Sequence, residues 1–128
     1  MTLTFLLTTA CYQAADIENF DETAFQNDAN GCEGTRLEMR KQVMKLPQAL
    51  QGFTQYEIEA TLGRADRQEL SNRSQKYLMY YIEPGPECDG AEADPFTMIV
   101  RFNSVGQANE ISFQNYWSLT WQLIFELW

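Results

Sequence analysis

The spacing of apolar residues changes from a helical to a strand-like period near Asp66, and this change constrains the fold more than any other feature of the chain. Before it, apolar side chains recur three or four residues apart. After it, they alternate along short segments that are separated by turn residues. Helical and strand segments therefore form separate blocks, which predicts an α+β protein. With 128 residues, the chain can bury one core but is too short for two domains.

A first helix is expected to begin at Thr35, because Thr35 and Glu38 have the spacing of a capping box. Pro47 should bend or restart this helix near Leu46. Gly52 is expected to end it. The apolar residues of the segment recur at helical spacing and predict one buried stripe, which consists of Met39, Val43, Leu46 and Leu50.

A second, shorter helix has the clearest local signal in the chain. Thr54 and Glu57 form another capping box, and Phe53 is placed to pack on Ile58 as a hydrophobic staple. Ile58 and Leu62 are four residues apart and are expected to face inward. Gly63 suits the left-handed residue that closes a helix.

Four strands are expected after the second helix. The first two flank the turn Ser71 to Ser74 and predict a hairpin. The second strand is apolar on both faces, which indicates a central position in the sheet. The turn Asn103 to Gly106 joins the last two. The expected strands cover residues 67–70, 75–82, 96–102 and 108–114.

The N-terminal eleven residues, MTLTFLLTTAC, are similar to the end of a bacterial lipoprotein signal peptide. In such peptides a small residue precedes the cysteine that becomes acylated, and here Ala10 precedes Cys11. The segment has no Lys or Arg, and its apolar stretch is short. A start codon assigned too far downstream would account for both features. We expect Cys11 to carry a lipid. The alternative is an ordinary first strand with a buried thiol at Cys11.

The other two cysteines, Cys32 and Cys88, form an even pair if Cys11 is lipidated. Free thiols tend to pair in the oxidising compartment that a lipoprotein enters. Each of the two lies beside turn-forming residues, and we expect a disulfide between them. The alternative is two unrelated reduced cysteines.

The C-terminal segment is rich in aromatic residues, and its periodicity fits both a strand and a helix. It is too short to span a bilayer as a helix. Three interpretations are open: an added strand or helix that completes the core, an aromatic arm that binds a partner, or a non-native tail. The candidate contact residues of such an arm are Trp117, Trp121, Phe125 and Trp128.

Charge and residue types exclude several classes of function. The formal net charge is −9, so the protein is expected to repel nucleic acids. Histidine is absent, which removes the commonest general base and metal ligand. We expect no cofactor, no metal and no catalysis. The acids that could serve an enzyme or bind calcium lie in a proline-rich loop that is expected to be solvated: Glu83, Glu87, Asp89, Glu92 and Asp94.

Three parts of the chain together resemble the SmpA/OmlA family. They are the segment from Gly52 to Gly63, the strand Tyr77 to Ile82, and Ile99 to Ala108 with its Phe102-to-Gly106 turn. Members of this family are small lipoproteins similar to the BamE component of the outer-membrane β-barrel assembly machinery. The resemblance covers residues 46–113. It implies two helices packed on one face of a three- to four-stranded antiparallel sheet, a location in the envelope and a role in binding proteins. Ala65 stands where the family usually has proline.

These expectations divide the chain into a lipoprotein-like signal segment (1–11), a polar tether that packs locally at most (12–34), a BamE-like α+β domain (35–115) and the aromatic segment (116–128). The expected function is that of a non-catalytic envelope lipoprotein that binds an envelope protein, held at the outer membrane and facing the periplasm. The alternative is a secreted inhibitor or ligand-binding module with a similar layout. An enzyme is the third class.

Overall fold

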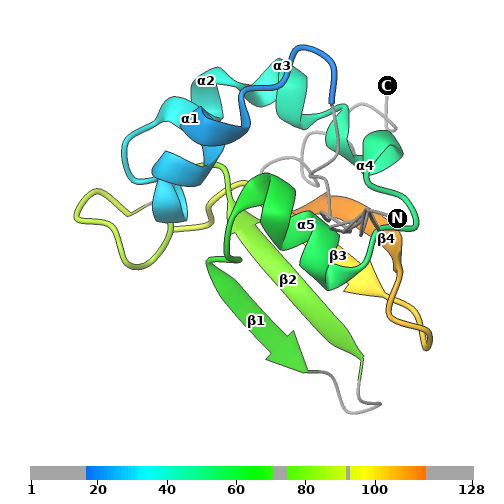
Figure 1. Cartoon of the computed structure of the whole chain (residues 1–128). Helices are drawn as coiled ribbons and strands as arrows, with labels where there is room; N and C mark the ends of the chain where they lie inside the picture. Colours follow the sequence, from blue (N-terminus) through cyan, green and yellow to red (C-terminus); the bar gives the residue numbers. More distant parts are fainter. Residues whose placement is uncertain (1–16, 71–74, 92, 115–128) are drawn as a thin grey trace, which may run out of the picture.

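A computed structural model describes residues 17–70, 75–91 and 93–114, and Figure 1 shows its arrangement. The predicted α+β class is confirmed. Each strand agrees with its expected range to within one residue at either end. The helices are α1 (Glu22–Asn27), α2 (Thr35–Glu38), α3 (Arg40–Val43), α4 (Leu46–Ala49) and α5 (Gln55–Leu62), with a 3₁₀ helix at Ala29–Gly31; the strands are β1 (Arg67–Leu70), β2 (Lys76–Tyr81), β3 (Thr97–Phe102) and β4 (Ala108–Gln114).

The four strands form one antiparallel sheet in the order β1-β2-β3-β4, so each strand pairs with its neighbour in sequence. The expected central position of β2 is confirmed. Leu78 pairs with Val100, and Val100 pairs with Ile111. A register shift between Arg101 and Phe102 interrupts the pairing of β3 with β4. Side chains in the same cross-strand row share one face of a sheet, so this register decides which residues lie together.

The core is one buried cluster that contains residues of the helices and of β2, β3 and β4. Alternate residues of the strands, among them Leu78, Val100 and Ile111, belong to the same buried cluster as the helical stripe. Figure 1 shows α5 lying against the sheet. The connection from α4 to α5 is fixed to the start of β4, because the Gly52 N–H donates to the Ala108 carbonyl at 2.8 Å and the Ala108 N–H donates to the Phe53 carbonyl at 2.7 Å.

The first expected helix is divided into α2, α3 and α4. All four residues of its predicted stripe are buried, and α4 restarts at Leu46 with Pro47 in its first turn, as expected. The predicted cap is wrong: Gly34 is the N-cap of α2, and Thr35 is already helical. The carboxylate of Asp28 instead accepts from the backbone N–H groups of Glu33 at 2.8 Å and Arg36 at 3.0 Å. A distant side chain therefore takes the place of the local capping box.

Helix α5 confirms the second predicted helix. Thr54 is its N-cap and accepts from the Glu57 N–H at 3.3 Å, and the Thr54 hydroxyl donates to the Glu57 carboxylate at 3.0 Å. Ile58 and Leu62 are fully buried. Gly63 ends the helix with a φ of +81°, a backbone conformation that residues with a Cβ atom rarely adopt.

The expectation that residues 12–34 contribute little to the core is wrong for Phe25. Asp21 caps α1 by accepting from the Ala24 N–H at 3.1 Å, and the helix places Phe25 in the buried cluster. The Phe25 ring lies 5.6 Å from that of Phe20 and 6.0 Å from that of Tyr80. Because Phe25 is fully buried against the sheet, the segment from α1 onward is part of the domain.

Candidate functional site: the open face of the sheet

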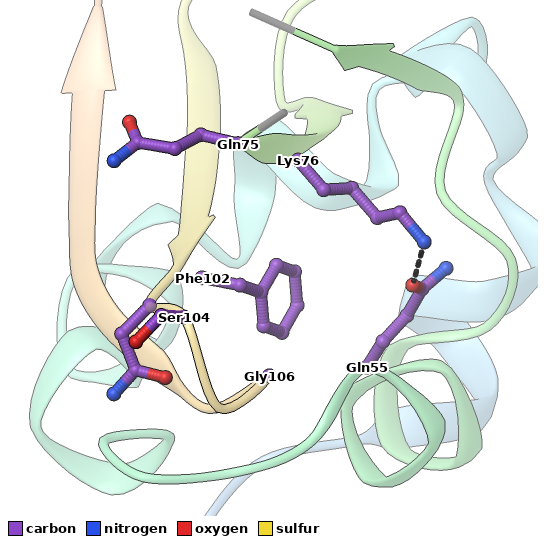
Figure 2. A pocket seen from close by; sticks show the side chains of 7 residues that line it. Gln55, Gln75, Lys76, Phe102, Ser104 and Gly106 are labelled. Atoms are coloured by element: carbon purple, nitrogen blue, oxygen red, sulfur yellow. Dashed lines mark hydrogen bonds between the residues drawn. The ribbon is translucent and has the colours of Figure 1, made fainter. Parts of the chain in front are cut away.

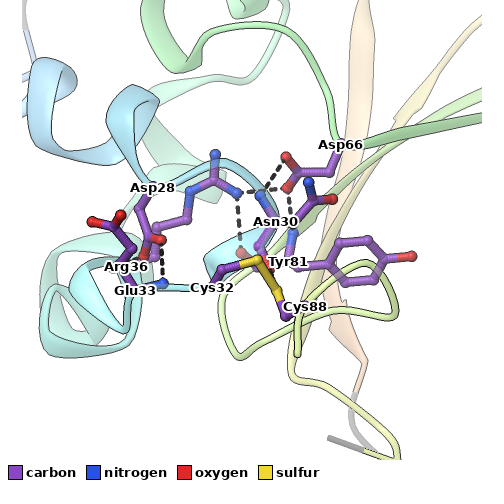
Figure 3. The surroundings of a disulfide bond; sticks show 8 residues. All are labelled: Asp28, Asn30, Cys32, Glu33, Arg36, Asp66, Tyr81 and Cys88. Atoms are coloured by element: carbon purple, nitrogen blue, oxygen red, sulfur yellow. Dashed lines mark hydrogen bonds and ion pairs between the residues drawn. A yellow bond between two sulfur atoms is a disulfide. The ribbon is translucent and has the colours of Figure 1, made fainter. Parts of the chain in front are cut away.

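The structure joins Cys32 and Cys88 in a disulfide, as the sequence predicts, with an S–S distance of 1.98 Å (Figure 3). The bond connects the turn after the 3₁₀ helix to the loop between β2 and β3. A second link reinforces it, because the Gly85 N–H donates to the Asn30 carbonyl at 2.9 Å. Gly31 lies so close to this loop that an added Cβ would stand 2.8 Å from the Glu83 carbonyl oxygen. The described part of the loop is thus held firmly against the helical side.

Beside the disulfide, a buried arginine connects the helices to the sheet (Figure 3). The Arg36 side chain is 1% exposed, and its guanidinium donates to Asp66, to the Phe25 carbonyl and to the Tyr81 carbonyl at 2.6, 2.9 and 3.1 Å. It also stands 4.2 Å from the centre of the Phe25 ring. A buried charge is tolerated only when it is paired and hydrogen-bonded, and these contacts meet that condition.

Asp66 completes this network from the other side. Its carboxylate accepts from the backbone N–H groups of Asn30 and Tyr81, each at 2.9 Å, in addition to Arg36. These bonds attach the 3₁₀ helix, α2 and β2 to one side chain. Since every donor serves to hold the elements together, the network is structural rather than a site that is free to take a ligand.

A cavity of about 460 Å³ opens near the end of the sheet where β3 turns into β4 (Figure 2). Three of its polar side chains bind other side chains: the Lys76 ammonium donates to Gln55 Oε1 at 2.9 Å, and Gln75 Oε1 accepts from the Arg101 guanidinium. The seven described residues that line it contain neither a carboxylate nor a thiol. They are Gln55, Gln75, Lys76, Phe102, Asn103, Ser104 and Gly106.

The face of the sheet opposite the buried cluster, which we call the open face, carries two cross-strand rows that run through all four strands. In the first row, Glu69 is opposite Tyr77, which is opposite Arg101, which is opposite Glu110. In the second row, Arg67, Met79, Ile99 and Ser112 follow one another in the same way. A shallow hollow of about 310 Å³ lies over the two rows. The open face therefore has an apolar centre, formed by Tyr77, Met79 and Ile99, with charged residues on both sides.

Charged groups at the border of the open face pair with one another. The Arg101 guanidinium lies 3.4 Å from the Glu110 carboxylate and 5.7 Å from the centre of the Tyr77 ring. The Arg67 guanidinium lies 2.7 Å from the Glu69 carboxylate. A hydrogen bond with the Tyr81 side chain, followed by the charge of Glu69, raises the pKa of Arg67. These two pairs place charged groups around the apolar centre.

The remaining predicted site residues are placed as follows. Cys11 and the candidate aromatic contacts Trp117, Trp121, Phe125 and Trp128 lie outside the described residues, as does Glu92. Of the loop acids, Glu83 accepts from the Phe96 N–H at 2.9 Å. The others, Glu87, Asp89 and Asp94, are exposed.

The described residues contain no group of three or more His, Cys, Asp or Glu residues placed to hold a metal ion. None of their helices is long and apolar enough to cross a membrane. Comparison with known proteins finds no matching protein-family model, curated protein or solved structure.

Proposed function

We propose that this chain is a non-catalytic bacterial envelope lipoprotein that binds a partner protein through the open face of its sheet. The observation that carries the proposal is the apolar centre of that face. Tyr77, Met79 and Ile99 are neighbours there, and each is partly exposed, whereas Leu78, Tyr80 and Val100 on the opposite face are fully buried. Adjacent apolar residues on an exposed sheet face are a common feature of interaction sites.

The charge of the protein indicates which partner fits. The first row of the open face ends in Glu69 on one side and Glu110 on the other, and the whole chain has a net charge of −9. This field attracts positively charged surfaces and repels negatively charged ones. The partner is therefore a protein whose contact surface has an apolar strip bordered by basic side chains.

The location in the envelope is supported by the cysteines. A disulfide between Cys32 and Cys88 persists in an oxidising compartment and is rare in the cytosol. Cys11 follows a lipoprotein-like segment and supplies the membrane anchor. The resemblance to the SmpA/OmlA family leads to the same proposal and adds a link to outer-membrane assembly.

A specific observation also favours the alternative function, a secreted inhibitor. The disulfide and the Gly85-to-Asn30 hydrogen bond hold the loop between β2 and β3 to the helical side, and the loop extends outward below α1 in Figure 1. Glu87 and Asp89 are exposed on it. A loop held in this way loses little conformational entropy when it binds, which favours tight complexes.

Site-specific photo-crosslinking in native envelopes tests the proposal. A photoreactive amino acid at Ile99, in the apolar centre, should yield a crosslinked protein of defined mass. Met79→Glu in the same chain should abolish this product, because a charge placed beside Ile99 disrupts the apolar contact. The matched control is Val105, which is 73% exposed in the turn between β3 and β4 and should yield no such product.

The outcomes separate the two functions. Equal products from Ile99 and Val105, or a product that survives Met79→Glu, would refute binding through the open face. A product obtained from position Glu87, with an enzyme that loses activity when the purified chain is added, would support the inhibitor instead.

A further inference from the structure

We infer that β1 is a self-association edge, at which two copies of the protein pair their β1 strands antiparallel and join their sheets into one. This inference goes beyond the proposed function, because it concerns an edge of the sheet rather than its open face. It starts from exposure: all four residues of β1 are exposed, and Leu70 is 69% exposed. Figure 1 shows β1 as the outermost strand of the sheet.

An exposed edge strand offers unpaired backbone groups to another strand. Among the described strands, β1 pairs only with β2. The strand at the other side, β4, is partly covered, because the connection from α4 to α5 bonds to its first residue and Thr54 forms a bridge with Gln107. The free edge of the described sheet is therefore β1.

The charges of β1 identify a second copy of this protein as the partner that pairs with the β1 edge. Arg67 and Glu69 flank Gln68, and both point to the open face because they pair with Met79 and Tyr77. When two β1 strands run antiparallel with Gln68 opposite Gln68, each Arg67 lies opposite the Glu69 of the other copy. The strand is thus complementary to itself, with two identical ion pairs related by a two-fold axis.

Neighbouring registers within β1 are unfavourable. Centring the pair on Arg67 puts arginine opposite arginine, and centring it on Glu69 puts glutamate opposite glutamate. A shift by one residue joins the open face of one copy to the helical side of the other, because side chains alternate along a strand. Only the register centred on Gln68 both matches the faces and pairs opposite charges.

Pairing requires one local rearrangement. Arg67 and Glu69 now bind each other within one chain at 2.7 Å, with side chains 55% and 48% exposed. In the dimer each exchanges this partner for the equivalent residue of the second copy. The hollows over the two open faces then belong to one continuous sheet, so the dimer presents the proposed binding surface twice.

Sedimentation of the full chain tests this inference. The chain should carry Cys11→Ser, which prevents lipidation, and should keep its disulfide. We expect a monomer–dimer equilibrium. Arg67→Glu places Glu opposite Glu69 and should raise the dimer dissociation constant by about tenfold or more. The double substitution R67E/E69R restores opposite charges in the same register and should return the constant to near its original value. Arg64→Glu is the matched control, since it makes the same charge change on an exposed residue outside β1 and should have little effect.

Crosslinking provides a second measurement that does not depend on charge. Gln68→Cys should form an intermolecular disulfide on mild oxidation, because Gln68 of each copy lies at the two-fold axis, whereas Val105→Cys should not. A chain that is monomeric at all concentrations would overturn the inference. A dimer that is insensitive to Arg67→Glu, or one that the double substitution does not rescue, would overturn it as well. None of these results depends on the photo-crosslinking at Ile99, so failure here leaves the proposed function standing.

Discussion

The guanidinium of Arg36 and the carboxylate of Asp66 lie 2.6 Å apart in the interior, with side chains that are 1% and 3% exposed. Arg36→Met would remove the cation and leave a buried carboxylate with two backbone donors only. Removing one partner of a buried pair costs about 3–5 kcal/mol, because the remaining charge stays desolvated. We expect a loss of this size in the free energy of unfolding measured with urea.

The matched control is the ion pair between Arg101 and Glu110, whose side chains are 38% and 60% exposed. Glu110→Gln should change the free energy of unfolding by less than about 1 kcal/mol, because solvent screens exposed pairs. Similar losses in the two variants would contradict the assignment of Arg36 as the link between helices and sheet.

Tyr80 should make stability decrease at alkaline pH. Burial, followed by the charges of Glu59 and Asp66, raises the pKa of Tyr80 above its usual 10.0, and its hydroxyl donates to the Gly63 carbonyl at 2.8 Å. In the unfolded chain the phenol loses its proton near pH 10, while the folded protein retains it. The contribution of Tyr80 is therefore complete below pH 10 and is lost as the pH rises toward the raised value.

Tyr80→Phe separates this effect from the titration of the other tyrosines. At neutral pH the free energy of unfolding of the variant should be lower by about 1 kcal/mol, the net value of one hydrogen bond. Above pH 10 its free energy of unfolding should decline less steeply than that of the parent. Parallel declines in urea titrations of the two proteins would show that Tyr80 does not carry the pH dependence.

Substitution of one buried residue and of one capping residue of helix α5 should destabilise the protein. Ile58 is fully buried, so Ile58→Ala should cost about 2–5 kcal/mol through lost burial and the cavity that remains. Thr54→Ala removes the acceptor for the Glu57 N–H and should cost about 1 kcal/mol. The melting temperature of Ile58→Ala should therefore be lower than that of Thr54→Ala. A nearly neutral Ile58→Ala would be inconsistent with α5 as a core helix.

The disulfide should contribute strongly to stability. It joins residues that are 56 positions apart, and closing a loop of this size stabilises the folded state by about 4 kcal/mol in the chain-entropy model. Replacing Cys32 and Cys88 by serine should lower the urea midpoint, and reductant should lower it in the parent only. Cys11→Ser should leave the midpoint unchanged. A parent protein in which three free thiols are counted would refute the pairing.

Lipidation is tested separately in a bacterial host. The chain expressed with its upstream sequence should incorporate a fatty-acid label and partition into detergent, and Cys11→Ser should abolish both. Labelling of the mutant at the parental level would refute the lipoprotein hypothesis and leave the fold unaffected.

Local signals in the sequence were sufficient for the strands and for α5. Alternating residues and turn residues located the strands, and a cap, a staple and a closing glycine located the helix. The sequence failed where the interaction is distant. Phe25 is buried because Tyr80 packs against it, and the first turn of α2 is capped by Asp28 rather than by Thr35. Neither contact leaves a periodic pattern.

The open face was even less accessible to prediction. Tyr77, Met79 and Tyr81 alternate with Leu78, Tyr80 and Ile82, so both faces of β2 look alike in sequence. Only the register with β3 and β4, together with the burial of one face, shows which residues share the open side. The role of Arg36 was equally inaccessible, because its partners Phe25, Asp66 and Tyr81 come from three distant parts of the chain.

The position of the disulfide in the chain has a consequence for the order of assembly. Both cysteines precede β3 and β4, and a chain is synthesised from its N-terminus. Oxidation can therefore close the ring that contains α2 to β2 before the second half of the sheet exists. The ring needs no residue of β3 or β4 for its closure, so an oxidant can act on the chain before these two strands are available.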